Sequence, residues 1–483
     1  MSLSNRTTMT FSACTDEEAD RLHLASLDIL ERTGVSVQEP EARGLLLDAG
    51  AWAGEGDRVR IPAWMVRQAL ATAPEVVALH TRDGRRTMPL GGRNVFFGTG
   101  SDTPNTIDPH TRERRPAVRE DVRRIAALCD ALPQIDFIMS MGIPSDVPTT
   151  VTYVHEFDRM VQGSRKPVVF TANDNRDMET IWEIATVVAG DAQAVRERPF
   201  LLLYSEPLSP LQHTRIGTEK LLFCAERGIP CVYVCGIMAG SNGPVTLAGS
   251  VALGNAECLS GLVISQLKSP GAPFVYGGNV PTLDMRVGQI AYASPEFSLT
   301  NSLYAALARR YRLPVWGLAG AGDAKTVDAQ AGAEAMMSIL AALLSGGNLV
   351  HDVGYLESGL TSSMEMILLG DELIAMCRRY VRGAALDENA FAADLIDQLG
   401  PGGLFLDTAH TRENFRTAHW IPRCLDRRRW DDWHADGSPT LYDRLNAEVR
   451  SILASHEPEP LPEDKQKEIA RIIRAREAQD AGT

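Results

Sequence analysis

Short apolar runs rich in Val, Ile, Phe and Tyr alternate with longer helical stretches through most of the chain. The runs are four or five residues long and lie at 135–139, 167–171, 200–204, 231–235, 274–277, 315–318, 348–351 and, more weakly, 403–406. Such alternation is typical of βα units that build a parallel sheet. Eight units predict an α/β fold of the (β/α)8 TIM-barrel type. An open doubly wound sheet is the alternative, but no glycine-rich phosphate loop follows the first run.

The two ends of the chain predict helices outside the barrel. Near the start, Leu22, Leu27 and Leu30 recur at helical spacing and Gly34 ends the helix. A second helix from Pro40, a short strand at 59–62 and a helix at 64–73 follow. At the other end, three closely spaced prolines predict an extended linker, and a helical pattern begins at Glu463. We therefore expect an N-terminal helical and small-strand layer at 1–130, a barrel at 131–420 and a C-terminal helical extension at 421–483.

Composition narrows the class of protein. The chain has 483 residues, 44% of them hydrophobic, with a formal net charge of -14. The arginine run at 427–429 is short and isolated, so we expect no nucleic-acid partner. No apolar run of transmembrane length is visible, and the polar segment 1–15 has no signal-peptide pattern, so we expect no membrane partner. Eight cysteines are scattered along the chain, and we expect them to be reduced thiols. Reduced thiols are typical of the cytosol, so we expect a cytoplasmic location.

Small and polar residues follow each predicted strand. Examples are the segments 142–146, 205–210, 236–240, 278–281, 319–325 and 352–355. Small residues let the backbone turn sharply beside a ligand. In a barrel, the carboxyl ends of the strands form the active-site face, so we expect the site to lie among these segments.

Several of these segments carry a resemblance to a known family. The matching stretches are 29–35, 135–137, 207–211, 239–246, 284–286, 322–330 and 356–361. In their order and number they resemble the trimethylamine methyltransferase family almost from end to end. The resemblance implies a TIM barrel and methyl transfer from a methylated amine to a cobalt corrinoid that a separate small protein carries.

The founding members of that family use pyrrolysine, whereas this sequence holds only the twenty common residues. Members without pyrrolysine resemble glycine betaine methyltransferases. The resemblance therefore implies transfer from a quaternary amine, glycine betaine first, giving dimethylglycine, to the Co(I) corrinoid (cobalamin) of a partner protein. Proline betaine, carnitine and choline are alternative substrates, and a non-catalytic betaine-binding barrel is an alternative function. We also expect a homo-oligomer.

The chemistry of a quaternary amine explains which residues to seek. Its leaving group is a neutral amine, so no proton has to move and no general base is required. The trimethylammonium group needs aromatic faces or carboxylates. The candidates for that role are Phe97, Tyr204, Tyr276, Trp316, Tyr355, Glu206 and Glu357. A betaine carboxylate needs cations or N–H donors, for which the candidates are Arg286, His351, Lys325 and Asn279.

Most candidates also have a plain structural interpretation. Tyr276 and Trp316 lie inside apolar runs and are equally suited to the core. Asp323, a further candidate for substrate contact, is placed to pair with Lys325. Arg286 is placed to pair with Asp284, and Glu357 to anchor a loop.

No metal site is expected. Cys231 and Cys235 face the same way on one predicted strand, but zinc requires further Cys or His ligands. A metal-dependent barrel hydrolase, the competing enzyme class, requires an early His-x-His pair that is absent.

Overall fold

The computed structural model describes residues 9–481. Residues 1–8, which belong to the polar N-terminal segment, and residues 482–483 lie outside the described part of the chain.

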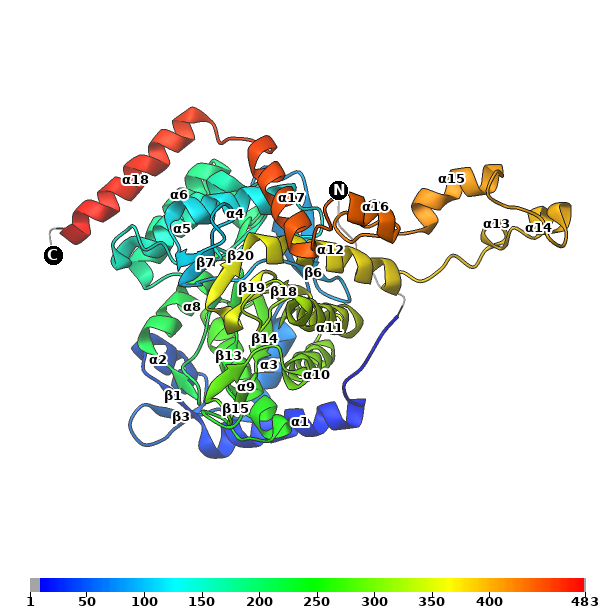
Figure 1. Ribbon diagram of the computed structural model, residues 1–483. Helices are drawn as coiled ribbons and strands as arrows, with labels where there is room; N and C mark the ends of the chain where they lie inside the picture. Colours follow the sequence, from blue (N-terminus) through cyan, green and yellow to red (C-terminus); the bar gives the residue numbers. More distant parts are fainter. Residues whose placement is uncertain (1–8, 482–483) are drawn as a thin grey trace.

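Parallel strands close a barrel at the centre of the molecule (Figure 1). Its strands are β6 (Phe96–Phe97), β9 (Val168–Phe170), β10 (Leu201–Ser205), β12 (Cys231–Tyr233), β14 (Phe274–Asn279), β17 (Val315–Leu318) and β18 (Leu349–His351). Strand β18 pairs with β6, and the segment around Phe137 bridges β6 to β9 through Gly98–Phe137 and Ile138–Val168. Counting that segment, eight strand positions complete the circle. The predicted (β/α)8 fold is confirmed.

The prediction of an eighth strand at 403–406 is wrong. These residues form no strand, and Leu404 and Leu406 are exposed. The missing strand is β6, which spans two residues and is too short for hydrophobic periodicity to reveal it. The barrel therefore begins before residue 131, inside the segment that the sequence assigned to the N-terminal layer.

A helix follows each strand position and covers the outside of the barrel. These helices are α4 (Arg119–Ala131), α5 (Thr152–Gly163), α6 (Asn175–Ala189), α8 (Arg215–Arg227), α9 (Leu247–Lys268), α10 (Pro295–Tyr311), α11 (Ala329–Ser345) and α12 (Met364–Val381). Among the described residues, α9 is the one helix long and apolar enough to cross a membrane, and 78% of its most apolar window is buried inside the protein. Its apolar character follows from packing against β14 on one side and α1 (Asp16–Asp28) and α3 (Ala63–Thr72) on the other.

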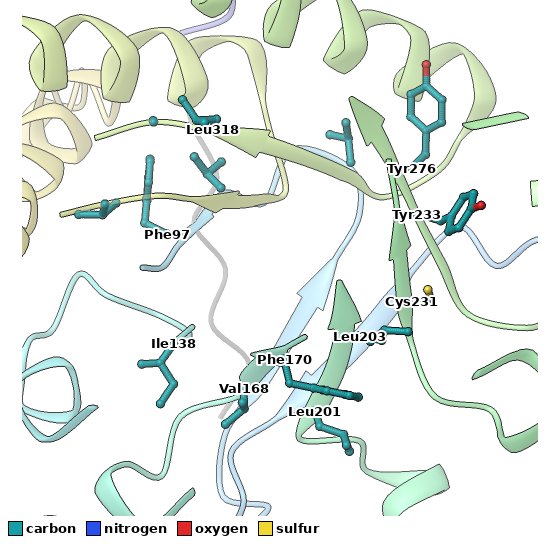
Figure 2. Packing of buried hydrophobic residues seen from close by; sticks show 14 of the residues in the cluster. Phe97, Ile138, Val168, Phe170, Leu201, Leu203, Cys231, Tyr233, Tyr276 and Leu318 are labelled. Carbon is teal, nitrogen blue, oxygen red and sulfur yellow. The ribbon is translucent and has the colours of Figure 1, made fainter. Parts of the chain in front are cut away.

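Side chains on the barrel strands alternate between two environments. The outward set, including Phe97, Ile138, Leu203, Tyr233 and Tyr276, packs under the helices (Figure 2). The inward set fills the lumen with Phe96, Phe137, Val169, Leu202, Val232, Val275, Trp316 and Leu349. The hairpin of β4 (Val77–His80) and β5 (Thr87–Leu90) adds four apolar side chains to the inward cluster. The barrel is thus a packed core rather than a pore.

The N-terminal layer packs against the outside of α9. Its remaining elements are a π-helical turn (Ile29–Thr33), α2 (Pro40–Asp48), β1 (Val35–Val37), β2 (Trp52–Ala53) and β3 (Arg58–Arg60). Strand β1 also pairs with β11 (Gln212–His213), which follows β10. At the other end, α17 (Leu441–Ser455) packs against α12 and α4, and α18 (Glu463–Ala481) packs against α6. The predicted helix from Glu463 is confirmed.

Between α12 and α17 the chain forms an arm that extends away from the barrel (Figure 1). It carries α13 (Glu388–Phe391), α14 (Ala393–Leu399), α15 (Ala409–Ala418) and α16 (Trp430–Ala435). Several large apolar side chains on it are exposed, including Leu386, Ile396, Leu406 and Trp430.

A buried ion pair supports the barrel where its pairing is sparsest. Asp136 Oδ2 accepts a hydrogen bond from the Phe97 backbone N–H at 3.0 Å and another from Arg378 Nη2 at 2.7 Å. Arg378, near the end of α12, also donates to the Val95 carbonyl and to Gln134 Oε1. One guanidinium therefore ties α12 to the first two strand positions, which are linked to each other by a single bridge.

We expect Asp136→Ala to lower the free energy of unfolding by about 3 kcal/mol, because it leaves the largely buried Arg378 charge without its partner. Chemical denaturation followed by circular dichroism measures the change. The matched control is Glu463→Ala, which breaks an exposed ion pair with Lys467 and should change stability by less than about 0.5 kcal/mol. Equal effects of the two substitutions would contradict this role of Asp136.

Candidate active site

A cavity of about 340 Å³ opens at the carboxyl ends of the barrel strands. It is lined by Ser101, Met139, Tyr204, Glu206, Gly236, Ile237, Met238, Ser241, Asn242, Asn279, Pro281, Ile290, Tyr292, His351, Asp352 and Tyr355. These residues follow six of the strand positions, as predicted for the active-site face of a barrel.

The inward register of the strands determines which side chains reach the cavity. Leu202 points into the lumen, and the same parity continues through Tyr204 to Glu206. In the same way Val275 leads to Asn279, and Leu349 leads to His351. A strand side chain contributes to the cavity only if it shares this parity.

Glu206 is the acidic centre of one wall. The Tyr204 hydroxyl donates a hydrogen bond to Glu206 Oε1, and Asn279 Nδ2 donates to the Tyr204 oxygen at 3.1 Å. Burial raises the pKa of Glu206, and the Tyr204 hydrogen bond opposes that rise. A Cβ at Gly236 would lie 3.2 Å from Glu206 Oε2, so the glycine keeps the space beside the carboxylate open.

His351 and Asp352 form the opposite wall. His351 Nδ1 is hydrogen-bonded to Asp352 Oδ1, and the Tyr292 hydroxyl donates to Asp352 Oδ2 at 2.5 Å. His351 Nε2 is buried and has no hydrogen-bond partner among the described residues. Below the imidazole lies Trp316, whose ring stacks on it with centroids 4.1 Å apart.

Loops beyond the strands complete the mouth. The Tyr355 hydroxyl donates to the Ser101 carbonyl oxygen, and a Cβ at Gly100 would overlap the Tyr355 ring and the Asp352 carboxylate. Next to Ser101, burial raises the pKa of Asp102 to about 6. A sheet of β7 (Asn105–Ile107), β8 (Arg114–Pro116), β19 (Tyr355–Leu356) and β20 (Thr361–Ser363) carries Tyr355.

On another side of the mouth, the hairpin of β15 (Thr282–Asp284) and β16 (Gln289–Ala291) leads to Tyr292. Asp323 holds this segment, because its carboxylate accepts the backbone N–H groups of Tyr292 and Ala293 at 3.0 and 3.1 Å. Asp323 therefore positions Tyr292 without lining the cavity itself.

The sequence-predicted residues separate into three groups. Those that line the cavity are Tyr204, Glu206, Asn279, His351 and Tyr355. Trp316 lies beneath the cavity and supports the His351 and Tyr204 rings. Those that do not line it are Phe97, Tyr276, Arg286, Asp323, Lys325 and Glu357.

Each residue of the last group has a structural reason for its position. Phe97 and Tyr276 have the outward parity, and the Tyr276 hydroxyl bonds to Asn255 in the core. Arg286 is 88% exposed and pairs with Asp284 at 2.7 Å. Lys325 Nζ donates to the Asp323 carbonyl, and Glu357 pairs with Arg114. A direct substrate contact in the cavity is not supported for any of them.

Sequence reasoning missed two central residues, Asp352 and Tyr292. Asp352 stands next to His351, and an acidic residue immediately after a strand-end histidine was an available signal. Tyr292 comes from a long excursion after β14 and carried no comparable signal. Met139, which also lines the cavity, could have been predicted as well, because it lies on the inward face of its predicted strand.

The site contains no recognisable metal centre. No group of three or more His, Cys, Asp or Glu side chains suited to a metal ion occurs within residues 9–481. Cys231 and Cys235 are both buried thiols, and Cys235 Sγ lies 3.2 Å from the Tyr304 hydroxyl.

Comparison with known proteins places this geometry in a family. The family model described as trimethylamine methyltransferase (MTTB) matches residues 2–481. A trimethylamine methyltransferase MttB of Desulfitobacterium hafniense (strain DSM 10664 / DCB-2) is 33% identical, covering 95% of this chain and 92% of the relative. A glycine betaine methyltransferase of Desulfitobacterium hafniense (strain Y51) is 32% identical, covering 96% and 97%.

Among solved structures, the Methanosarcina barkeri monomethylamine methyltransferase (MtmB) is similar with a TM-score of 0.52 and 12% identity, covering 92% of this chain and 88% of that one. This likeness supports the fold. The match over nearly the whole chain, together with relatives above 30% identity, shows that the chain belongs to the trimethylamine methyltransferase family and is an enzyme of the methyltransferase class.

Proposed function

We propose that this enzyme removes a methyl group from a quaternary ammonium compound and passes it to the Co(I) corrinoid of a carrier protein. The observation that carries the proposal is the cavity at the barrel mouth, where Glu206 and Asp352 lie among the rings of Tyr204, Tyr292 and Tyr355. Carboxylates and aromatic faces are the groups that attract a quaternary ammonium ion.

Glu206 has the strongest reason to bind the cation. Its desolvated charge is unfavourable, which is why burial raises its pKa. A bound ammonium ion favours the ionised carboxylate, and their attraction is stronger in this enclosed space than in water. Tyr204 and Asn279 fix the carboxylate in place before the cation arrives.

The reaction requires positioning rather than proton transfer. A Co(I) corrinoid supplies the nucleophile when its carrier docks on the enzyme. The enzyme's walls must hold one N-methyl group toward the mouth and keep the remaining methyl groups against Tyr204, Tyr292 and Glu206. The departing tertiary amine is neutral, so the reaction needs no general base.

The mouth has features suited to a docking carrier. A corrin ring is larger than a cavity of about 340 Å³, so the methyl group has to be transferred at the opening. Large apolar side chains are exposed on four loops that follow the strands, namely Leu208, Val245, Met285, Val287 and Leu360. Exposed apolar side chains grouped around a site favour a protein contact. We call these five residues the apolar rim.

Three further expectations stay predictions. The exposed apolar side chains of the arm support a homo-oligomer, because such side chains favour a protein contact. The arm leaves the barrel at the end of α12, near Arg378, on the face opposite the mouth, so this contact would leave the mouth free. Eight free thiols suit a cytoplasmic location. Glycine betaine is the substrate that the resemblance implies, although its carboxylate needs a cationic partner.

We expect the purified enzyme to demethylate at least one quaternary ammonium compound with free cob(I)alamin, and trimethylamine far more slowly. A tertiary amine is a poorer methyl donor because its leaving group is an amide anion unless a proton is added first. Loss of the Co(I) absorbance over a panel of onium compounds measures the rates. Turnover of trimethylamine as fast as that of the best quaternary compound would contradict the proposal.

Substitution in the apolar rim should separate docking from chemistry. We expect Met285→Asp combined with Val287→Asp to slow transfer to the carrier protein by about tenfold or more, because a charged group replaces apolar contact area. Transfer to free cob(I)alamin should be unchanged. The control is Leu386→Asp with Leu404→Asp on the arm, and a loss of carrier transfer confined to that control would contradict docking at the mouth.

A further inference from the structure

The cavity's charge and hydrogen-bonding groups narrow the substrate class beyond a quaternary amine. We infer that the cavity selects an ammonium ion without a carboxylate, bearing a hydroxyl or another hydrogen-bond donor near the cationic nitrogen. Choline is the simplest compound of this class. The inference rests on the proposed function for its catalytic meaning, but the binding preference can be measured alone.

The first observation is the charge of the lining. Of the residues that line the cavity, none is an arginine or a lysine, whereas Glu206 and Asp352 are both carboxylates. His351 is the one lining side chain able to carry a positive charge, and Asp352 already bonds to it. The pair of His351 and Asp352 is therefore neutral at most, and Glu206 remains to balance one external cation.

The predicted cationic partners for a betaine carboxylate lie elsewhere. Arg286 and Lys325 are exposed outside the cavity and bond to Asp284 and to the Asp323 carbonyl. Lys220 also fails to line the cavity, and its ammonium group donates to the Ala172 carbonyl at 2.7 Å. Lys220 lies close enough to oppose the rise in the Glu206 pKa, but it does not reach the cavity surface. A bound zwitterion would thus bring a second negative charge close to Glu206, with no arginine or lysine in the lining to pair with it.

The second observation concerns hydrogen-bond donors. Each tyrosine hydroxyl of the lining already donates its proton to the protein: Tyr204 to Glu206, Tyr292 to Asp352 and Tyr355 to the Ser101 carbonyl. A substrate carboxylate accepts hydrogen bonds and cannot donate them, so it gains nothing from these groups.

Two buried polar atoms of the lining have no partner among the described residues. The Asn279 amide nitrogen donates to the Tyr204 oxygen, and Asn279 Oδ1 is buried with no hydrogen-bond partner in the described part of the chain. His351 is 5% exposed, and its Nε2 is likewise without a partner among the described residues. When Nδ1–H donates to Asp352, the neutral imidazole presents a lone pair at Nε2. In that protonation state both atoms can accept from a substrate hydroxyl, and neither can donate to a carboxylate.

Methyl transfer at the mouth brings the substituent on the opposite side of the substrate nitrogen close to Asn279 Oδ1 and His351 Nε2. The reacting methyl group has to face the open mouth, so the substituent on the opposite side of the nitrogen points toward the cavity walls. His351, at the end of β18, and Asn279, at the end of β14, are the lining residues with open acceptors. A hydroxyethyl group can donate to either of these two acceptors, whereas a carboxymethyl group cannot.

The test compares four ligands by isothermal titration calorimetry. Choline and n-propyltrimethylammonium differ by a hydroxyl in place of a methyl group, and glycine betaine and its methyl ester differ by one charge. We expect choline to bind about 100-fold more tightly than glycine betaine, since a buried unpaired charge is costly. We also expect choline to bind about tenfold more tightly than n-propyltrimethylammonium, because the hydroxyl satisfies a buried acceptor. The ester should bind more tightly than the betaine.

A variant can reverse the preference. Ser241 lines the cavity near its opening and is exposed, so Ser241→Lys should place a cation there. We expect this variant to gain at least about tenfold in the ratio of betaine to choline affinity, while the control Ser241→Gln leaves the ratio unchanged. Melting curves of both variants verify that the fold is retained.

The outcomes separate the inference from the proposed function. Tighter binding of choline than of betaine, without methyl transfer to Co(I) from any compound, would support the inference and refute the proposed function. Betaine binding as tight as choline binding, with transfer intact, would refute the inference alone. Failure of all four ligands to bind would refute both.

Discussion

Alternation of side chains in a closed parallel barrel is the constraint on which the site depends. Once the ring is closed between β18, β6 and the segment around Phe137, each strand has one inward and one outward face. The inward face fills the lumen with Leu202, Val275 and Leu349. Further along the same face of these strands, Tyr204, Asn279 and His351 reach the mouth. A shift of one residue in any strand would replace a cavity residue by a core residue.

The cavity at the barrel mouth is built around two carboxylates, Glu206 and Asp352, whose removal from water is unfavourable. Asp352 accepts hydrogen bonds from Tyr292 and His351, and Glu206 accepts one from Tyr204. These bonds hold the acidic groups in place, yet the cavity contains no arginine or lysine to neutralise Glu206. A cationic ligand beside Glu206 would favour the ionised carboxylate. The same reasoning favours a methyl donor that carries its own positive charge and requires no base.

Much of this could be predicted from the sequence, because the signals were local. The βα alternation, the polar strand ends and the lining residues Tyr204, Glu206 and His351 follow from short patterns. The first strand could not be found, since β6 spans two residues. Phe97 and Tyr276 lie outside the cavity because they have the outward parity, which could not be assigned to Phe97 without β6. Arg286 and Asp323 also lie outside the cavity, because hairpin and loop positions after β14 and β17 depend on tertiary contacts that the sequence does not show.

Glu206 provides the charge that would bind a quaternary ammonium ion in this cavity. The direct measurement is the dissociation constant of tetramethylammonium, by calorimetry, for the wild type, Glu206→Gln and Glu206→Asp. Glutamine keeps the shape and a hydrogen bond to Tyr204 but removes the charge, so we expect about ten- to a hundred-fold weaker binding, with aspartate retaining part of the affinity. An unchanged dissociation constant for Glu206→Gln, in a variant that melts like the wild type, would contradict the account.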